Sequence, residues 1–133
     1  MKVHGTFEVY DFKPADITVP NPVTTAVPVG VSTMEKRYSG GIRGRSTTIF
    51  TAAYDPGKGT GSYLAMESFE GAVGGRHGTL NFLHSASTTG SDRSNELFAI
   101  VEGSGTGDFR NVSGTGGLVV DAEAHGLWLD LGD

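Results

Sequence analysis

The stretch Ser62–Thr88, SYLAMESFEGAVGGRHGTLNFLHSAST, decides the fold. Side chains alternate with a period of two on both sides of Gly74-Gly75, a pattern typical of β-strands with one buried face. A Gly-Gly pair readily adopts the positive φ angles that a tight hairpin turn needs. We therefore predict two antiparallel strands, Ser62–Glu70 and Gly78–Thr88, joined at this turn.

A hairpin centred on Gly74-Gly75 also predicts which side chains meet. It pairs Glu67 with Phe82 and Ala65 with His84, so Glu67 and His84 become diagonal neighbours about 7–8 Å apart on one face. A carboxylate and an imidazole in an apolar wall can act as an acid/base pair, or they can form a structural ion pair across the sheet. Both interpretations depend on the register, since a slip of one residue moves every side chain to the other face.

The rest of the chain continues the same alternation between Gly-rich turns. Further strands are predicted at Val3–Tyr10, Val31–Ser39, Ile42–Tyr54, Asn95–Glu102, Thr115–Ala122 and Ala124–Leu131. Four prolines make residues 12–30 an irregular connection, because proline removes a backbone donor from a sheet. Eight short antiparallel strands form either a sandwich or a closed barrel. We predict an all-β fold, an eight-stranded antiparallel closed barrel forming one domain over residues 1–133, since closure removes the exposed edges.

Composition and charge exclude several classes of protein. The 133 residues include 21 Gly and no Cys, which argues against helical bundles and disulfide-stapled scaffolds. The net charge of −5 and the lack of a basic run argue against nucleic-acid partners and against binding to anionic membranes. No apolar stretch resembles a membrane span or a signal peptide, so we expect a cytoplasmic, most simply bacterial, protein.

The motifs of the common cofactor and metal sites are missing from the sequence. The four His residues lack a metal-binding spacing such as HExxH. The Gly-rich strings at 57–60 and 103–107 lack the spacing of a phosphate loop and the strand-to-helix context of a dinucleotide site. We therefore predict neither a metal nor a cofactor, and the absence of a GxSxG motif excludes an α/β-hydrolase triad.

The interior of the predicted barrel is the candidate site. A cavity with an apolar wall and few polar groups is a typical small-molecule binding site. The predicted ligand-binding residues are Phe50, Ala65, Leu80, Phe82 and His125, and the predicted catalytic residues are Glu67, His84 and Tyr63. His125 alternates with three leucines, so it is either a ligand contact or a histidine of the core.

Several short motifs together resemble a bacterial family of small uncharacterised proteins, a domain of unknown function with an allene oxide cyclase-like barrel. One stretch, residues 103–114 (GSGTGDFRNVSG), is similar to a signature found before a late strand in allene oxide cyclases and dirigent proteins. The resemblance spans about residues 3–131, and its other motifs are HGTF at 4–7, KRYSG at 36–40, YLAME at 63–67, GAVGGRHG at 71–78 and FLH at 82–84.

The resemblance implies an eight-stranded barrel with an elongated apolar cavity, often in a dimer or a trimer. By fold analogy it implies cyclisation or isomerisation of an apolar substrate, although the nearest family has no established activity. The rival hypothesis is a non-enzymatic interaction module with a filled barrel. Its interface would use outward-facing aromatic residues, namely Tyr10, Tyr38 and Trp128.

Overall fold

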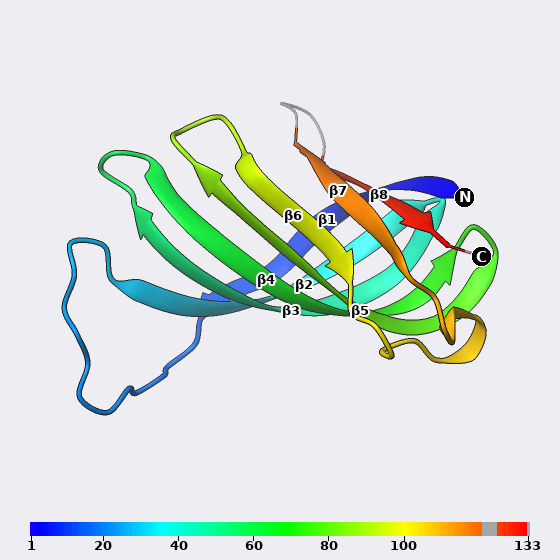
Figure 1. The fold of residues 1–133 in the computed structure, drawn as a ribbon, viewed down its shortest axis with the longest axis horizontal. Helices are drawn as coiled ribbons and strands as arrows, with labels where there is room; N and C mark the ends of the chain where they lie inside the picture. Colours follow the sequence, from blue (N-terminus) through cyan, green and yellow to red (C-terminus); the bar gives the residue numbers. More distant parts are fainter. Residues whose placement is uncertain (121–124, 133) are drawn as a thin grey trace.

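The computed structural model describes residues 1–120 and 125–132 and confirms the all-β prediction. Eight antiparallel strands lie in sequence order, and the sheet closes into a barrel because β1 pairs with β8 (Figure 1). The elements are β1 (Lys2–Pro14), β2 (Val29–Gly40), β3 (Ile42–Asp55), β4 (Thr60–Val73), β5 (Arg76–Thr88), β6 (Ser94–Ile100), the short 3-10 helix η1 (Gly107–Phe109), β7 (Gly114–Val120) and β8 (His125–Leu131). In the described part of the chain, no helix is long and apolar enough to span a membrane.

The predicted irregular connection at 12–30 is too long at both ends. β1 continues to Pro14 and β2 already begins at Val29. The extension of β1 depends on a bulge, since the register with β2 shifts between Tyr10 and Lys13, and Asp11 adopts a φ of +54°. A bulge re-aims the side chains that follow it, and here it brings the Phe12 ring to 6.1 Å from the ring of Phe50. Residues 121–122 and 124, predicted as strand, lie outside the described residues.

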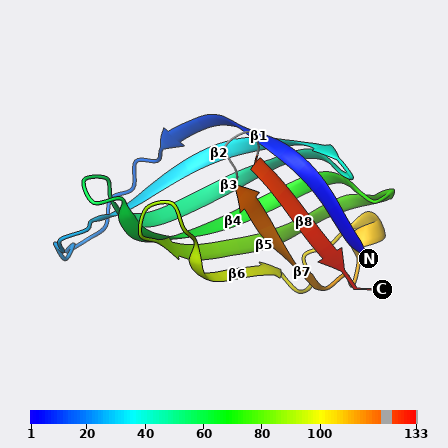
Figure 2. The ribbon, with the colours of Figure 1, turned by 90° about the horizontal axis from the view of Figure 1, so that it is seen from above.

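The strands differ in length, and this gives the barrel two unlike ends. β2–β5 have 12 to 14 residues, whereas β6, β7 and β8 have seven each. Seen from above, β7 and β8 cover only the right-hand part of the sheet, and β2–β5 continue beyond them to the left (Figure 2). We call the right-hand part, where both termini lie, the closed end and the left-hand part the open end.

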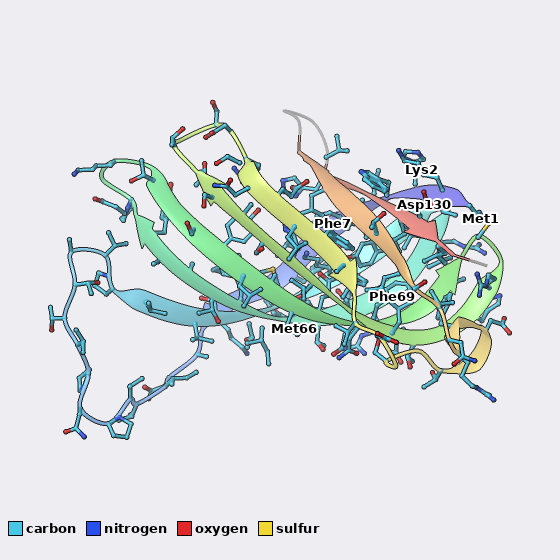
Figure 3. All side chains as sticks on the ribbon, in the orientation of Figure 1. Met1, Lys2, Phe7, Met66, Phe69 and Asp130 are labelled. Atoms are coloured by element: carbon cyan, nitrogen blue, oxygen red, sulfur yellow. The ribbon has the colours of Figure 1, made fainter. Side chains whose placement is uncertain are left out.

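The closed end is packed solid. Its large inward side chains, each no more than 2% exposed, are Ile42, Phe69, Val73, Leu80, Phe82, Leu127, Leu129 and Leu131. Phe109 of η1 is fully buried against them, so the connection between β6 and β7 plugs this end of the barrel. Figure 3 shows Phe7 and Phe69 inside the ring and Met66 outside it. Each fully buried side chain of this size contributes about 1.5–3 kcal/mol of transfer free energy.

Three glycines form a row across neighbouring strands, and one of them, Gly71, lies within β4 although the predicted strand ended at Glu70. Gly44, Gly71 and Gly78 pair directly with one another across β3, β4 and β5. A Cβ atom at Gly44 would lie 2.1 Å from the carbonyl oxygen of Glu70, and its φ of +140° is unfavourable for other residues. This row of paired glycines lets the long strands bend sharply at the closed end, where they curve upward in Figure 1.

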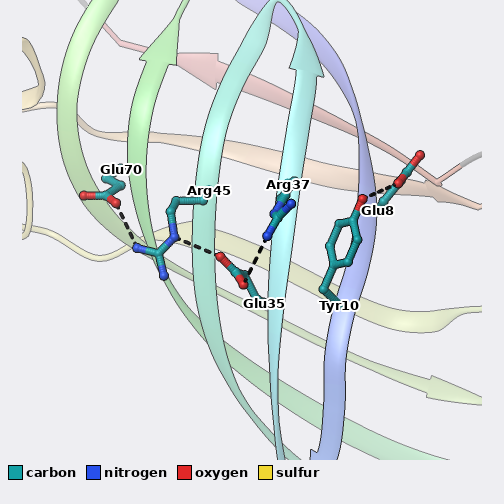
Figure 4. A network of polar contacts seen from close by, with 6 residues as sticks. All are labelled: Glu8, Tyr10, Glu35, Arg37, Arg45 and Glu70. Atoms are coloured by element: carbon teal, nitrogen blue, oxygen red, sulfur yellow. Dashed lines mark hydrogen bonds and ion pairs between the residues drawn. The ribbon is translucent and has the colours of Figure 1, made fainter.

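The outer face of β1–β4 carries a chain of exposed polar contacts (Figure 4). Arg45 is at its centre and donates to Glu35 at 2.9 Å and to Glu70 at 2.8 Å. Arg37 stacks on the Tyr10 ring, with the guanidinium carbon 4.4 Å from the ring centroid, and Tyr10 donates to Glu8. Exposed pairs of this kind contribute about 0–1 kcal/mol each, so they add little to the fold.

Candidate functional site

The open end of the barrel contains a cavity of about 480 Å³. Its volume is within the range typical of small-molecule sites. Most of its wall is apolar and comes from β1 to β4, with a contribution from β7: Phe7, Val9, Phe12, Met34, Phe50, Ala52, Tyr54, Tyr63, Ala65 and Leu118.

The cavity forms where small inward residues of β3 and β4 alternate with aromatic ones, since Phe50 pairs with Ala65 and Ala52 with Tyr63. On β4, Phe69 fills the core, while Ala65 and Gly61 line the cavity. On β3, Ala52 also leaves space. β7 and β8 do not extend far enough to fill this space from the opposite side (Figure 1), whereas β6 runs along the open-end half of β5, from Ser87 to Phe82.

A buried polar cluster forms the floor of the cavity beside the core. The Glu67 carboxylate accepts a bond of 2.9 Å from Lys36 Nζ, a bond of 2.6 Å from Ser46 Oγ and a third from the Tyr38 hydroxyl. The side chains of Lys36 and Glu67 are only 9% and 4% exposed. Removing both charges from water is costly, and the three donors offset much of that cost. Burial, together with the neighbouring Glu67 carboxylate, raises the pKa of Tyr38 well above its ordinary value, so its phenol stays protonated.

A histidine–carboxylate pair lies on the β5 side of the cavity. His84 is 5% exposed, and its Nε2 lies 2.9 Å from Glu96 Oε2. Burial lowers the pKa of His84 and the Glu96 carboxylate only partly opposes this, so the imidazole is neutral at pH 7. Since an ionised carboxylate only accepts hydrogen bonds, the contact assigns the proton to Nε2 and leaves the basic lone pair on Nδ1.

Tyr63 and Arg93 supply the polar groups nearer the opening. Arg93 Nε donates to the Tyr63 hydroxyl at 3.2 Å, and the Tyr63 ring stacks on Phe50 with centroids 5.3 Å apart. Partial burial raises the pKa of Tyr63, against the opposing effect of Arg93. The phenol therefore keeps its proton and can donate it to a bound molecule.

Comparison with known proteins places the chain in a family. The model of a family of proteins of unknown function, DUF3224, matches residues 3–131. The chain belongs to the DUF3224 family. A crystal structure of a DUF3224 protein of unknown function from Shewanella oneidensis MR-1 is similar, with a TM-score of 0.85 and 23% sequence identity over 99% of this chain and 96% of that chain. No curated protein matches the chain. The predicted uncharacterised family is thus confirmed, and the kinship with allene oxide cyclases stays a prediction.

The register predicted for the β4–β5 hairpin of this DUF3224 chain is confirmed. Glu67 pairs with Phe82 and Ala65 with His84, so Glu67 and His84 share the inner face. They nevertheless bond to different partners: Glu67 to residues of β2 and β3, and His84 to Glu96 of β6. The structure therefore shows two separate polar groups where the sequence suggested one acid/base pair.

The other predicted site residues divide between the cavity and the core. Phe50, Tyr63, Ala65, His84 and His125 line the cavity. Leu80 and Phe82 are 1% and 2% exposed and belong to the packed core instead.

The structure decides between the two alternatives for His125 and corrects the expected face of Tyr38. His125 is exposed beside the cavity, with its ring 5.4 Å from that of Phe7, so it is not a core histidine. Tyr38, expected on an outward interface, is buried inside the barrel and donates to Glu67. Its neighbour Arg37 takes the outward position.

Sequence reasoning missed the partners of the predicted residues. Glu67 accepts hydrogen bonds from Lys36, Ser46 and Tyr38. His84 is hydrogen-bonded to Glu96, and Tyr63 accepts a hydrogen bond from Arg93. Lys36 and Tyr38 both alternate with Arg37, which was a usable signal for a shared inward face. Within residues 1–120 and 125–132, no three His, Asp or Glu side chains gather in a way that could hold a metal ion.

Proposed function

We propose that this DUF3224 protein binds a small, largely apolar molecule in the cavity at the open end of its barrel. The observation that supports this most is the contrast within one interior: a solid core at the closed end and about 480 Å³ of space at the open end. The wall is aromatic and aliphatic, and a few polar groups converge on it. This combination is the default pattern of a ligand site.

Binding of a neutral fluorescent probe, N-phenyl-1-naphthylamine, tests the proposal. Ala52 lines the cavity, whereas its neighbour Ala53 lies outside the lining. We expect Ala52→Phe to fill part of the cavity and weaken probe binding at least tenfold, and the matched control Ala53→Phe to leave binding unchanged. A probe that does not bind, or that binds equally to both variants, would contradict the proposal.

For the cyclase or isomerase activity implied by the fold analogy, we propose that His84 is the base. His84 Nδ1 would accept a proton from a carbon atom of the bound molecule and return it to another carbon, so the reaction needs no further reactant. Glu96 holds the imidazole in the basic tautomer, and the Tyr63 phenol supplies a donor. Exchange of the methyl protons of bound 2-acetylnaphthalene in D2O, followed by NMR, tests this role. We expect His84→Gln to slow the exchange at least tenfold, and an unchanged rate would contradict it.

A second candidate function, assembly with another copy of the chain, has an observation of its own. An apolar row crosses the outer face of four strands, with Ile49, Met66, Leu83 and Ala99 paired in sequence. Ile49 and Met66 are 59% and 40% exposed. Such a row can bury itself against its own copy across a two-fold axis, which fits the predicted homo-oligomer.

Light scattering tests this assembly. We expect a dimer that dissociates in Ile49→Lys and persists in Thr47→Lys, which changes the neighbouring outward position on the same strand. A monomeric wild-type protein would contradict the assembly and leave the ligand site as the only proposed function.

A further inference from the structure

We propose that the molecule bound in the cavity is a neutral compound with one carbonyl-type oxygen, and that Lys36 Nζ is the donor that holds this oxygen at the cavity floor. This inference rests on the proposed ligand-binding function and specifies the chemical class of the ligand. Three features support it: the position of Lys36, a buried hydroxyl without a partner on the neighbouring strand β3, and the balance of charge.

Lys36 is a buried cation that lines the cavity. Its ammonium group has three N–H donors, and one of them is directed to Glu67 Oε1 at 2.9 Å. The nitrogen also lies 4.7 Å from the centroid of the Phe7 ring, which itself lines the cavity. A ring face is a weaker partner than an oxygen atom, so the ammonium retains donor capacity on the cavity side.

Thr48 shows a further unmet hydrogen bond in the same part of the barrel. Its Oγ1 is the buried side-chain oxygen that lacks a hydrogen-bond partner among the residues that the structure describes. Thr48 pairs with Met34 of the cavity wall on one side and with Glu67 of the floor on the other. An unpaired buried hydroxyl costs about 1–3 kcal/mol, so this polar layer is suited to an additional oxygen atom.

The charges at the floor favour a neutral oxygen over a carboxylate. Glu67 already neutralises Lys36 at 2.9 Å, and the lowered pKa of His84 keeps that imidazole uncharged. The other cation that lines the cavity, Arg93, lies nearer the opening beside Tyr63. A ligand carboxylate at the floor would therefore bring a negative charge close to the buried Glu67 carboxylate. Burying such a charge is far more costly than burying a carbonyl group that accepts one hydrogen bond.

Three two-ring probes of one shape test the proposal. These are 2-acetylnaphthalene with a ketone, 2-isopropenylnaphthalene with a methylene group in place of the oxygen, and 2-naphthoate with a carboxylate. Their affinities are measured by displacement of N-phenyl-1-naphthylamine from the whole protein. We expect the ketone to bind at least tenfold more tightly than 2-naphthoate, and tighter binding of 2-naphthoate would overturn the proposal.

The role of Lys36 is tested with the double variant Lys36→Met/Glu67→Gln, which removes both charges and leaves no unpaired ion. We expect the ratio of ketone to hydrocarbon affinity to fall at least tenfold in this variant. In Thr48→Val we expect the affinity for the ketone to fall about threefold and the affinity for the hydrocarbon to stay unchanged. An unchanged ratio in the double variant would overturn the assignment of Lys36.

The carbonyl stretching band of bound 2-acetylnaphthalene gives a readout that needs no variant. A hydrogen bond from an ammonium group weakens the C=O bond, so we expect the band of the bound ketone to lie at lower frequency than in hexane. A band at the hexane frequency would overturn the inference while the proposed ligand binding stands. If none of the probes binds, the proposed function itself fails, and the inference fails with it.

Discussion

The closed and open ends of this barrel share the long strands β2–β5 but differ in what the inward positions of these strands carry. At the closed end, Phe69, Phe82 and Leu129 are almost fully buried and η1 covers the opening. At the open end, Ala52 and Ala65 occupy inward positions, and β7 and β8 do not reach across. The packed core that stabilises the fold and the space proposed for a ligand therefore lie in different parts of one interior, with the Lys36–Glu67 cluster at the boundary.

The largest expected effect is the loss of a large side chain from the closed end. Phe69→Ala should lower the free energy of unfolding by about 3–5 kcal/mol, because a cavity remains where the ring packed. The matched change at the open end, Phe50→Ala, should cost less than half as much, since that ring is only half-buried. Chemical denaturation of both variants measures the difference, and equal losses would break the distinction between the two ends.

Breaking the Lys36–Glu67 ion pair at the boundary should lower the free energy of unfolding by about as much as Phe69→Ala, or slightly less. Lys36→Met leaves the buried Glu67 carboxylate without its cation, and breaking a buried pair in this way costs about 3–5 kcal/mol. Adding Glu67→Gln should recover most of that loss. If the double variant is no more stable than the single one, the cluster is not held together by its charges.

A smaller effect is expected from His84 and depends on pH. Its pKa is lowered from 6.5 in the folded protein, so between these two values the unfolded chain binds more protons than the folded one. Stability should therefore decline as the pH falls below about 6.5 and level off below the folded pKa. His84→Gln should flatten this dependence of stability on pH, whereas the control His77→Gln, at an exposed histidine, should leave it unchanged. Urea denaturation at several pH values measures both. A slope that survives in His84→Gln would be inconsistent with this cause.

The smallest effect is expected on the outer face. Arg45→Ala removes two exposed ion pairs, with Glu35 and Glu70, and should cost less than about 1 kcal/mol. The residual effect should shrink in high salt, because exposed pairs are screened. A salt-independent loss above 2 kcal/mol would show that the network in Figure 4 contributes to the fold.

The sequence predicted the eight strands and one hairpin register because its signals were local. Gly74-Gly75 makes a symmetric two-residue turn, and the pairing of Glu67 with Phe82 follows directly from it. The same reasoning at Gly40-Gly41 would fail by one residue, since Lys36 pairs with Ser46 and not with Arg45. The amide of Gly41 donates to His4 of β1, a contact between distant segments that no turn rule contains. An error of one residue inverts the faces across the turn. The alternation of Lys36 and Tyr38 therefore showed that they share a face, but the turn rule did not show that this is the face of Glu67.

The difference in strand length, and with it the cavity, was also beyond the sequence. The pattern at 95–102 predicts a strand, but it does not show that β6 ends at Ile100 and that a single pair, Ala99 with Thr115, connects it to β7. The bulge at Asp11 was hidden for the same reason, because Phe12 turns inward only through its register with β2. Closure of a barrel depends on such nonlocal pairings.

The most direct test of the account is an amide NMR titration of the protein with N-phenyl-1-naphthylamine. We expect the shifted resonances to belong to the open end, including those of Ala52, Ala65 and His84, and the resonances of Phe69 and Leu129 at the closed end to stay in place. Shifts confined to the outer row of Ile49, Met66 and Leu83, or no shifts at all, would contradict a binding site inside the barrel.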